Sequence, residues 1–233
     1  MARNCELFLL FGVKIPQALR EKIVGGDFMI QTVEIFYSFQ CPYSYLALDR
    51  LSELEHKYDI RCLWQAYSAK AAGQNFQTTG INLERLTYVK EDVQRLAKKM
   101  NMPIMVREDW PEQEFDPERS TRGAVVANDL EIILEYNVKM FQRWWAEGQD
   151  PNEQNFFIEL CDDLDIDPNE FAGRMSTTDT RERVRGLYKR GRKLMVFDTP
   201  TMIIGEERFV GIDRIDMVEE KLTSMGLKKP NWL

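Results

Sequence analysis

The chain has 233 residues, of which 44% are hydrophobic and 30% charged, and its formal net charge is −7. This composition is typical of a globular protein with one sizeable core, and no repeats or low-complexity segments appear. The acidic balance argues against a nucleic-acid partner, and no apolar run approaches the roughly 20 residues of a membrane-spanning helix.

Residues 1–28 do not fit the pattern of the rest of the chain. The apolar run at 7–11 follows Glu6 and precedes no small-residue cleavage site, so it is a poor secretory signal. We expect residues 1–28 to be an N-terminal extension, either from an upstream start codon or a disordered tail, because the first strand pattern begins after Met29. Targeting is the alternative.

The stretch from Val33 to Ala47 changes from a strand pattern to a helix pattern. We predict a strand over about 32–39, because aromatic and β-branched residues are apolar at almost every position, as in a strand buried on both faces. A helix follows Pro42, which suits the first helical turn, and its apolar stripe runs through residues 43, 47, 51, 54 and 58.

Cys41 therefore lies where a strand meets the start of a helix. Unpaired backbone N–H groups and the partial positive charge of a helix N-terminus stabilise a thiolate, so we expect the pKa of Cys41 to lie below its ordinary value of about 8.5. The alternative is that Cys41 is a small buried apolar residue.

The remaining elements are predicted in chain order. A strand at 59–66 should run parallel to the first, because strand–helix–strand crossovers are right-handed. Residues 70–81 read as a loop and 110–117 as a second, acidic loop. Helices are predicted at 83–100, 121–146, 152–164, 168–175 and 178–194, then a hairpin of strands 201–204 and 208–210, and a last helix at 214–225.

The run Phe39-Gln40-Cys41-Pro42-Tyr43-Ser44-Tyr45-Leu46-Ala47 resembles the active-site turn of the DsbA-like branch of the thioredoxin superfamily. Within that branch it is most similar to 2-hydroxychromene-2-carboxylate isomerases and kappa-class glutathione transferases, whose turn reads Ser-Pro-Tyr/Phe-Ser-Tyr/Trp. The resemblance implies an α/β thioredoxin fold (β-α-β … α-β-β-α) with a large all-helical insertion.

The resemblance also implies a division of the chain. The DsbA-like domain would span 29–225, with the thioredoxin fold at 32–70 and about 180–225. The helical insertion would cover about 75–180, and residues 226–233 would form a C-terminal tail.

Two candidate catalytic residues follow from the resemblance. Cys41 is the residue that a disulfide oxidoreductase of this family uses as nucleophile. Ser44 stands where such an enzyme has its second, resolving cysteine, whereas the isomerases and transferases have serine at both places. Ser44 is either an ordinary residue of the first helical turn or a hydroxyl that binds the sulfur of Cys41 or of a cosubstrate.

The candidate glutathione-binding residues are Thr199, Pro200, Ile212, Asp213 and Gln74. The family has a cis-proline at the start of its third strand, and the backbone of the preceding residue pairs with glutathione or a protein substrate. Its Gly-Ser/Asn-Asp-Arg motif grips the γ-glutamyl end, and Ile212 departs from it by lacking a polar group. Asp213 is alternatively a helix cap, and Gln74 lies in a loosely aligned loop.

The other cysteines and the single histidine offer little for chemistry. Cys5, Cys62 and Cys161 form no C-x-x-C pair with each other or with Cys41. With only His56 besides them, a zinc site and a disulfide framework are both disfavoured, which favours a reducing cytoplasm. We predict that Cys62 and Cys161 are buried apolar residues.

Two further groups are predicted to be structural. Phe141, Trp144 and Trp145 should pack the insertion, or line a hydrophobic substrate pocket, and the basic run 181–193 should be a solvated helix face.

The preferred hypothesis is a DsbA-like thiol oxidoreductase that uses the single thiol of Cys41 on glutathione-linked or other disulfide substrates. The first alternative is a glutathione-dependent isomerase or transferase, and the second is a non-catalytic binding protein. The expected partners are glutathione, as cosubstrate, and a small electrophilic or disulfide substrate, with no metal, membrane or nucleic acid. A homodimer stays open.

Overall fold

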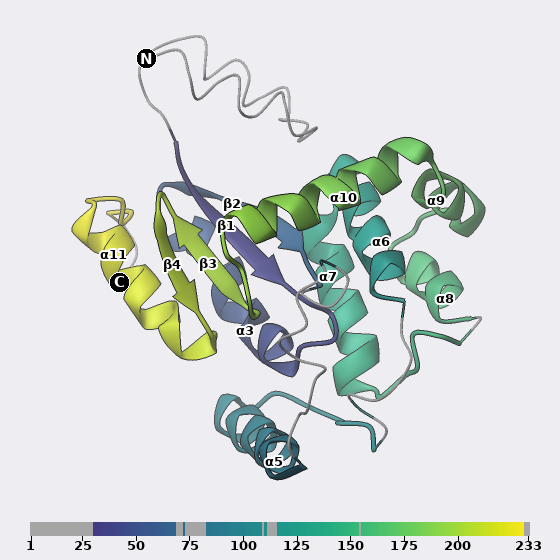
Figure 1. Ribbon diagram of the computed structural model, residues 1–233, viewed down its shortest axis with the longest axis horizontal. Helices are drawn as coiled ribbons and strands as arrows, with labels where there is room; N and C mark the ends of the chain where they lie inside the picture. Colours follow the sequence, from purple (N-terminus) through teal and green to yellow (C-terminus); the bar gives the residue numbers. More distant parts are fainter. Residues whose placement is uncertain are drawn as a thin grey trace.

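The computed structural model of the chain describes residues 30–68, 72, 83–108, 110, 116–153 and 155–230. Within these residues the strands β1 (Gln31–Tyr37), β2 (Ile60–Ala66), β3 (Thr201–Ile204) and β4 (Glu207–Val210) form one sheet in the order β2-β1-β3-β4 (Figure 1). β2 runs parallel to β1, whereas β3 runs antiparallel to β1 and β4 antiparallel to β3. The predicted four-stranded thioredoxin sheet is confirmed.

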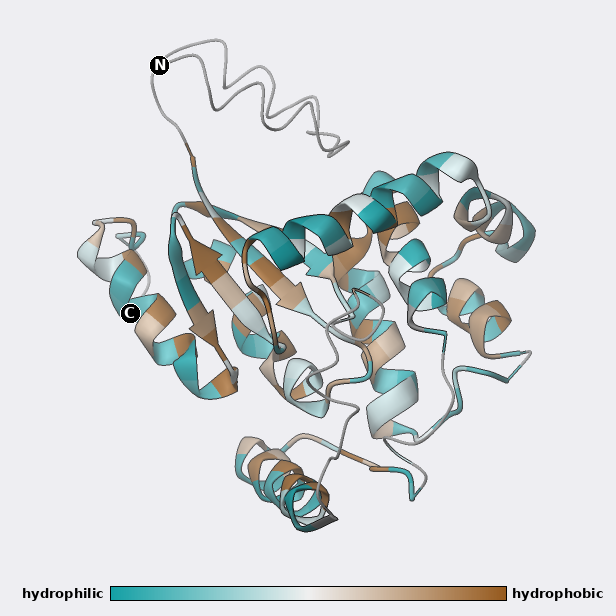
Figure 2. Cartoon of the chain, in the orientation of Figure 1, coloured by the Kyte–Doolittle hydropathy of each residue, from teal (hydrophilic) through white to brown (hydrophobic). Residues whose placement is uncertain are grey.

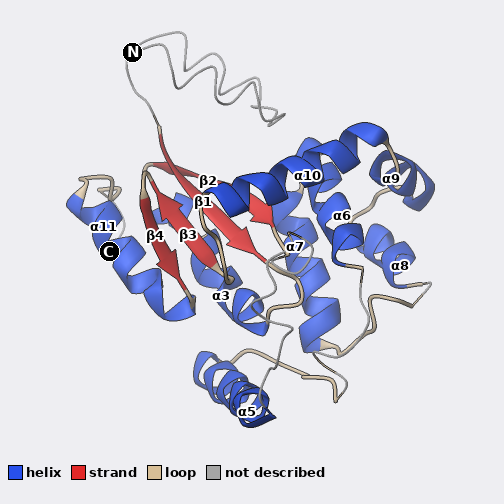
Figure 3. Ribbon diagram, viewed as in Figure 1, coloured by secondary structure: helices blue, strands red, loops and turns tan. Residues whose placement is uncertain are grey.

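Helices surround this sheet, and most of them come from the segment between β2 and β3 (Figure 3). The chain order is β-α-β, a helical insertion, then α-β-β-α, as predicted. The helices are α3 (Pro42–Ser52), α4 (Leu54–Lys57), α5 (Leu83–Met100), α6 (Pro117–Asp129), α7 (Ile133–Phe141), the π-helix η2 (Gln142–Ala146), α8 (Phe156–Asp163), α9 (Pro168–Met175), α10 (Thr178–Lys193), the 3-10 turn η3 (Ile212–Arg214) and α11 (Ile215–Ser224).

The two faces of the sheet bury different sets of side chains because residues of β1 point alternately to opposite sides. Val33 and Ile35 belong to a core cluster that also includes residues of α3 and α11. Phe36 belongs to another cluster, with residues of α6 and α10. Figure 1 shows α10 running across the sheet.

α10 is anchored to the sheet and leaves a basic surface outside. Arg190 forms a two-pronged ion pair with Glu34 of β1, and Arg183 binds Asp129 of α6 in the same way. The basic residues that are exposed are Arg181, Arg185, Lys189, Arg192 and Lys193. The hydrophilic colouring of α10 in Figure 2 follows this surface, which confirms the predicted solvated face.

Several predicted boundaries are wrong. The helix expected over 121–146 is broken, because Glu131 has a left-handed φ of 62° and separates α6 from α7. α6 already begins at Pro117, capped by the side chain of Asp116. β1 ends at Tyr37 rather than at residue 39, and α8 starts at Phe156 rather than at residue 152.

The predicted N-terminal extension, residues 1–28, lies outside the described residues. The predicted loop 70–81 also lies outside them, apart from Ala72. None of the described helices is long and apolar enough to cross a membrane.

Gly191 gives a test of the packing of α10 on the sheet. A Cβ atom at Gly191 would lie 2.3 Å from Cε2 of the buried ring of Tyr67, whereas a Cβ at Gly186 of the same helix would meet no atom within 4 Å. Gly191→Ala should therefore lower the free energy of unfolding by about 1–3 kcal/mol, and Gly186→Ala should raise it by up to about 1 kcal/mol. Urea denaturation of both variants measures the difference. Equal stability of the two variants would contradict this packing.

Candidate functional site

Cys41 occupies the residue before α3, at the junction between β1 and that helix. Its backbone is extended (φ −99°, ψ 112°), and Pro42 forms the first helical position. The Cys41 carbonyl accepts hydrogen bonds from the backbone N–H groups of Ser44 and Tyr45, at 3.0 and 3.3 Å. The predicted position at a helix start is confirmed, and the residue as a whole is half-buried.

The thiol of Cys41 faces the start of β3. Its Sγ donates a hydrogen bond to the carbonyl oxygen of Thr199 at 3.0 Å, although the two residues lie 158 positions apart in the chain. The peptide bond between Thr199 and Pro200 is cis, as predicted. The structure thus brings together Cys41 and the residue before the proline, two of the candidate residues.

Ser44 lies beside the same sulfur and is buried. Its Oγ accepts a hydrogen bond from the backbone N–H of Ser38 at 3.3 Å, which ties the first turn of α3 to the end of β1. Ser44 also lies near enough to the Cys41 sulfur to lower the pKa of the thiol. The two readings of Ser44 both stay open, since its hydroxyl accepts its hydrogen bond from the backbone of Ser38.

The expected low pKa of Cys41 is wrong. Burial raises the pKa of the thiol above its ordinary value, and the negative charge of Asp198 raises it further. The side chain of Thr199 and the neighbouring Ser44 lower the pKa in part but do not reverse the shift. At neutral pH the sulfur is therefore a protonated thiol, which can donate a hydrogen bond.

The segment after β4 also approaches the proline. The N–H of Gly211 donates to the carbonyl of Pro200 at 2.8 Å, and the φ of 102° at this position favours glycine. Asp213 follows in an exposed turn and forms a 3.3 Å ion pair with Arg214. Its expected role as the cap of α11 is wrong, because Arg214 is the cap residue and no side chain caps that helix.

The other candidate ligand residues differ in what the structure says of them. Ile212 is half-buried and packs against the hydrophobic clusters. Gln74 lies outside the described residues.

Cys62 and Cys161 are buried as predicted, and burial raises the pKa of Cys161 to about 11. The described residues contain no cluster of His, Cys, Asp or Glu suited to a metal ion.

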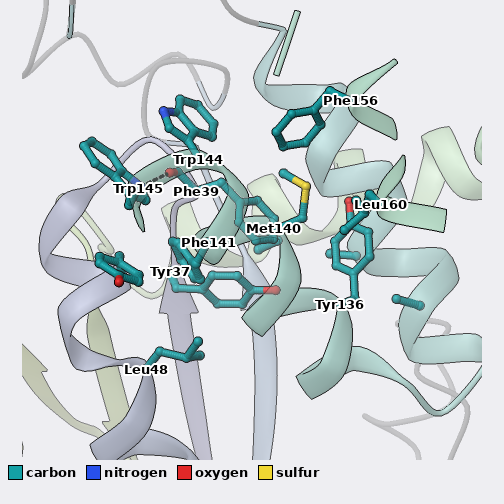
Figure 4. Close-up of a cluster of buried hydrophobic side chains, with 14 of the residues drawn as sticks. Tyr37, Phe39, Leu48, Tyr136, Met140, Phe141, Trp144, Trp145, Phe156 and Leu160 are labelled. Carbon is teal, nitrogen blue, oxygen red and sulfur yellow. Dashed lines mark hydrogen bonds between the residues drawn. The ribbon is translucent and has the colours of Figure 1, made fainter. Parts of the chain in front are cut away.

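Sequence reasoning missed the contacts that hold the turn before Cys41. The indole N–H of Trp145 donates to the carbonyl of Phe39 at 2.8 Å, shown as a dashed line in Figure 4. The indole of Trp110 donates to the carbonyl of Gln40 at 3.1 Å, and its ring meets that of Trp145 edge to face. Trp145 therefore packs the insertion, as expected, and also holds the turn before Cys41.

Two more functional candidates were missed. Asp198 sits next to Thr199 and acts on the Cys41 sulfur through its charge. Tyr43 donates from its hydroxyl to Asp92 of α5 at 3.0 Å, which links the first turn of α3 to the insertion. Asp198 lies in the run at the cis-proline, which resembles the family's Phe-Gly-Val-Pro-Thr pattern, but it stands where that pattern has glycine, so the resemblance gave it no role.

A small recess adjoins the turn on the side of the insertion. It has room for about one water molecule. Hydroxyl and amide side chains dominate its lining, which consists of Ser38, Phe39, Gln40, Tyr67, Ser68, Ser120 and Thr121.

Comparison with known proteins agrees with this geometry. The model of the DSBA-like thioredoxin domain family matches residues 32–223. A protein from Pseudomonas putida named 2-hydroxychromene-2-carboxylate isomerase is 27% identical over 194 residues, covering 82% of this chain and 93% of that protein.

Two solved structures have the same fold. A 2-hydroxychromene-2-carboxylate isomerase superposes with a TM-score of 0.74 at 24% identity, covering 84% of this chain and 96% of that one. The cytosolic disulfide reductase DsbM from Pseudomonas aeruginosa, solved with GSH, has a TM-score of 0.58 at 16% identity, covering 82% of this chain and 99% of that one.

The raised pKa of Cys41 can be tested by the pH dependence of its alkylation. Because only the thiolate reacts, the rate at Cys41 should rise with a midpoint above that of the same cysteine in the chain unfolded by denaturant. Mass spectrometry of iodoacetamide-treated protein separates Cys41 from Cys62 and Cys161. A midpoint below about 8.5 would contradict the burial argument and favour a thiolate site.

Proposed function

Because this chain belongs to the DSBA-like thioredoxin domain family, we propose that it is a glutathione-dependent isomerase of the 2-hydroxychromene-2-carboxylate isomerase type. Its relatives are named as isomerases and oxidoreductases, so the chain is an enzyme. The observation that carries the proposal is the hydrogen bond from the thiol of Cys41 to the carbonyl oxygen of Thr199.

The thiol of Cys41 would take the place of the serine hydroxyl of the resembled isomerases, beside the sulfur of glutathione. A neutral S–H group can donate a hydrogen bond to the sulfur of bound glutathione and stabilise that sulfur as a thiolate. Hydrogen bonds to charged groups are about twice as strong as neutral ones. Ser44 would support this role, because it is buried in the first turn of α3 and lies near the same sulfur.

Glutathione would lie across the start of β3. The backbone of Thr199 beside Pro200 would pair with its peptide groups, as the family resemblance implies. Asp213 and Ile212 would face its γ-glutamyl end, since Gly211 joins their segment to Pro200. The negative Asp213 suits the γ-glutamyl ammonium, while Ile212 offers only apolar contact.

The reaction would be a reversible addition. The cyclic hemiketal first opens, with cleavage of its ring C–O bond, to an unsaturated keto acid. The proton of the glutathione thiol leaves to solvent, and the resulting thiolate forms a C–S bond at the double bond of the keto acid, whose electrons move onto the carbonyl to give an enolate. The former double bond can now rotate, and collapse of the enolate breaks the C–S bond and releases the isomer. No oxidant is needed, and glutathione is regenerated.

Thiol–disulfide exchange is the second candidate, because Cys41 itself is a potential nucleophile and the neighbour DsbM was solved with GSH. Here a Cys41 thiolate would attack a glutathione mixed disulfide, and a second glutathione would release it. This route requires the thiolate, which burial and Asp198 disfavour. A cytoplasmic location fits both candidates, since both use reduced glutathione.

Substitution of Cys41 separates the two candidates. Cys41→Ser retains a hydrogen-bond donor, so glutathione binding and isomerisation of 2-hydroxychromene-2-carboxylate should survive within a few-fold, while disulfide reduction is lost. Cys41→Ala is the matched control without a donor, and its isomerase rate should fall about 10- to 100-fold. Steady-state assays of both reactions measure this.

Ser44→Cys gives the converse test, since it supplies a resolving thiol and should introduce dithiol oxidation. If the wild-type protein reduces mixed disulfides but isomerises nothing, the redox candidate replaces the proposal.

A further inference from the structure

Both polar backbone groups of Thr199 are already occupied within the protein. The Thr199 N–H donates to Oδ1 of Asp198 at 2.8 Å, and the Thr199 carbonyl accepts the S–H of Cys41 at 3.0 Å. Thr199 itself is 7% exposed. A peptide ligand that pairs with this residue as a strand would need the same N–H and the same carbonyl.

We propose that the carboxylate of Asp198 competes with a carbonyl group of glutathione for the backbone N–H of Thr199, and so sets the affinity of the site for glutathione. This inference rests on the proposed function, and it deepens that function by assigning a specificity-determining residue. On binding, a ligand carbonyl takes the place of the carboxylate, and a ligand N–H takes the place of the Cys41 thiol. The displaced thiol is then free to turn to the ligand sulfur.

The loop around Asp198 is built to hold this competitor in place. The Asp198 carbonyl accepts a hydrogen bond from the Thr201 hydroxyl at 2.6 Å, which fixes the backbone on both sides of Thr199. The carboxylate is only half-buried, so it can return to solvent when displaced. Phe197, the preceding residue, is 48% exposed, which leaves this side of the loop open to a ligand.

The charge of Asp198 acts separately from its hydrogen bond. A negative charge near the Cys41 sulfur disfavours a second negative charge there, whether on Cys41 or on a bound thiolate. The hydrogen bond, in contrast, affects only the availability of the Thr199 N–H. Substitutions that remove one property and keep the other can therefore distinguish them.

Asp198→Asn and Asp198→Ala make this separation. Asn loses the charge but retains an acceptor oxygen for the Thr199 N–H, whereas Ala loses both. Asp162→Ala removes an exposed carboxylate from α8 and serves as the control. Isothermal titration with reduced glutathione measures affinity, and the alkylation profile of Cys41 reports the charge at the sulfur.

We expect Asp198→Ala to bind glutathione about tenfold more tightly than the wild type, because the competing charge-assisted hydrogen bond is gone. The affinity of Asp198→Asn for glutathione should lie between those of the wild type and Asp198→Ala, and the affinity of Asp162→Ala should equal that of the wild type. Both variants of Asp198 should shift the alkylation midpoint of Cys41 downward by similar amounts. Binding by Asp198→Ala when the wild type shows none also supports the proposal.

Equal affinity of the wild type and Asp198→Ala would overturn the inference while leaving the proposed function in place. Equal affinity of Asp198→Asn and Asp198→Ala, both above the wild type, would overturn it too, since the charge alone would then explain the gain. If neither the wild type nor any variant binds glutathione, the proposed function fails, and the inference that rests on it fails with it.

Discussion

The carbonyl groups of Phe39 and Gln40 find no partner within their own turn, and two tryptophans from the helical insertion supply the donors. A buried carbonyl without a partner costs about 1–3 kcal/mol, against a total folding stability of about 5–15 kcal/mol. The turn that carries Cys41 therefore depends on Trp145 and Trp110 for its conformation. Although the insertion lies between β2 and β3 in sequence, it helps to build the site of the thioredoxin sheet (Figure 1).

Burial also determines the pKa of the Cys41 sulfur. A charge at a helix N-terminus gains about 0.3–1 kcal/mol, and up to about 2 kcal/mol in favourable sites. Desolvation of the sulfur acts against the helix effect and raises the pKa of Cys41 above its ordinary value. Asp198 acts in the same direction as burial. Cys41 is thus a thiol placed where a helix would favour a thiolate, and it donates a hydrogen bond to the carbonyl oxygen of Thr199.

The sheet and the contact between Cys41 and the segment at Thr199 could be predicted from sequence, because strand patterns and the family turn are local signals. The break of the expected helix 121–146 at Glu131 could not, because apolar periodicity continues across a single residue with positive φ. The start of α6 had a local signal that was missed, since Asp116 precedes a proline as a cap residue does. The pKa of Cys41 and the hydrogen bond of Trp145 depend on tertiary packing, which no short motif encodes.

The protonation state of the Cys41 sulfur is the central claim, and infrared spectroscopy observes it directly. The difference spectrum between the wild type and Cys41→Ser at neutral pH isolates the S–H stretching band of this residue. The account predicts a band at neutral pH, lowered in frequency by the hydrogen bond to Thr199, that moves again when glutathione binds. Absence of the band at neutral pH would show a thiolate and contradict the account.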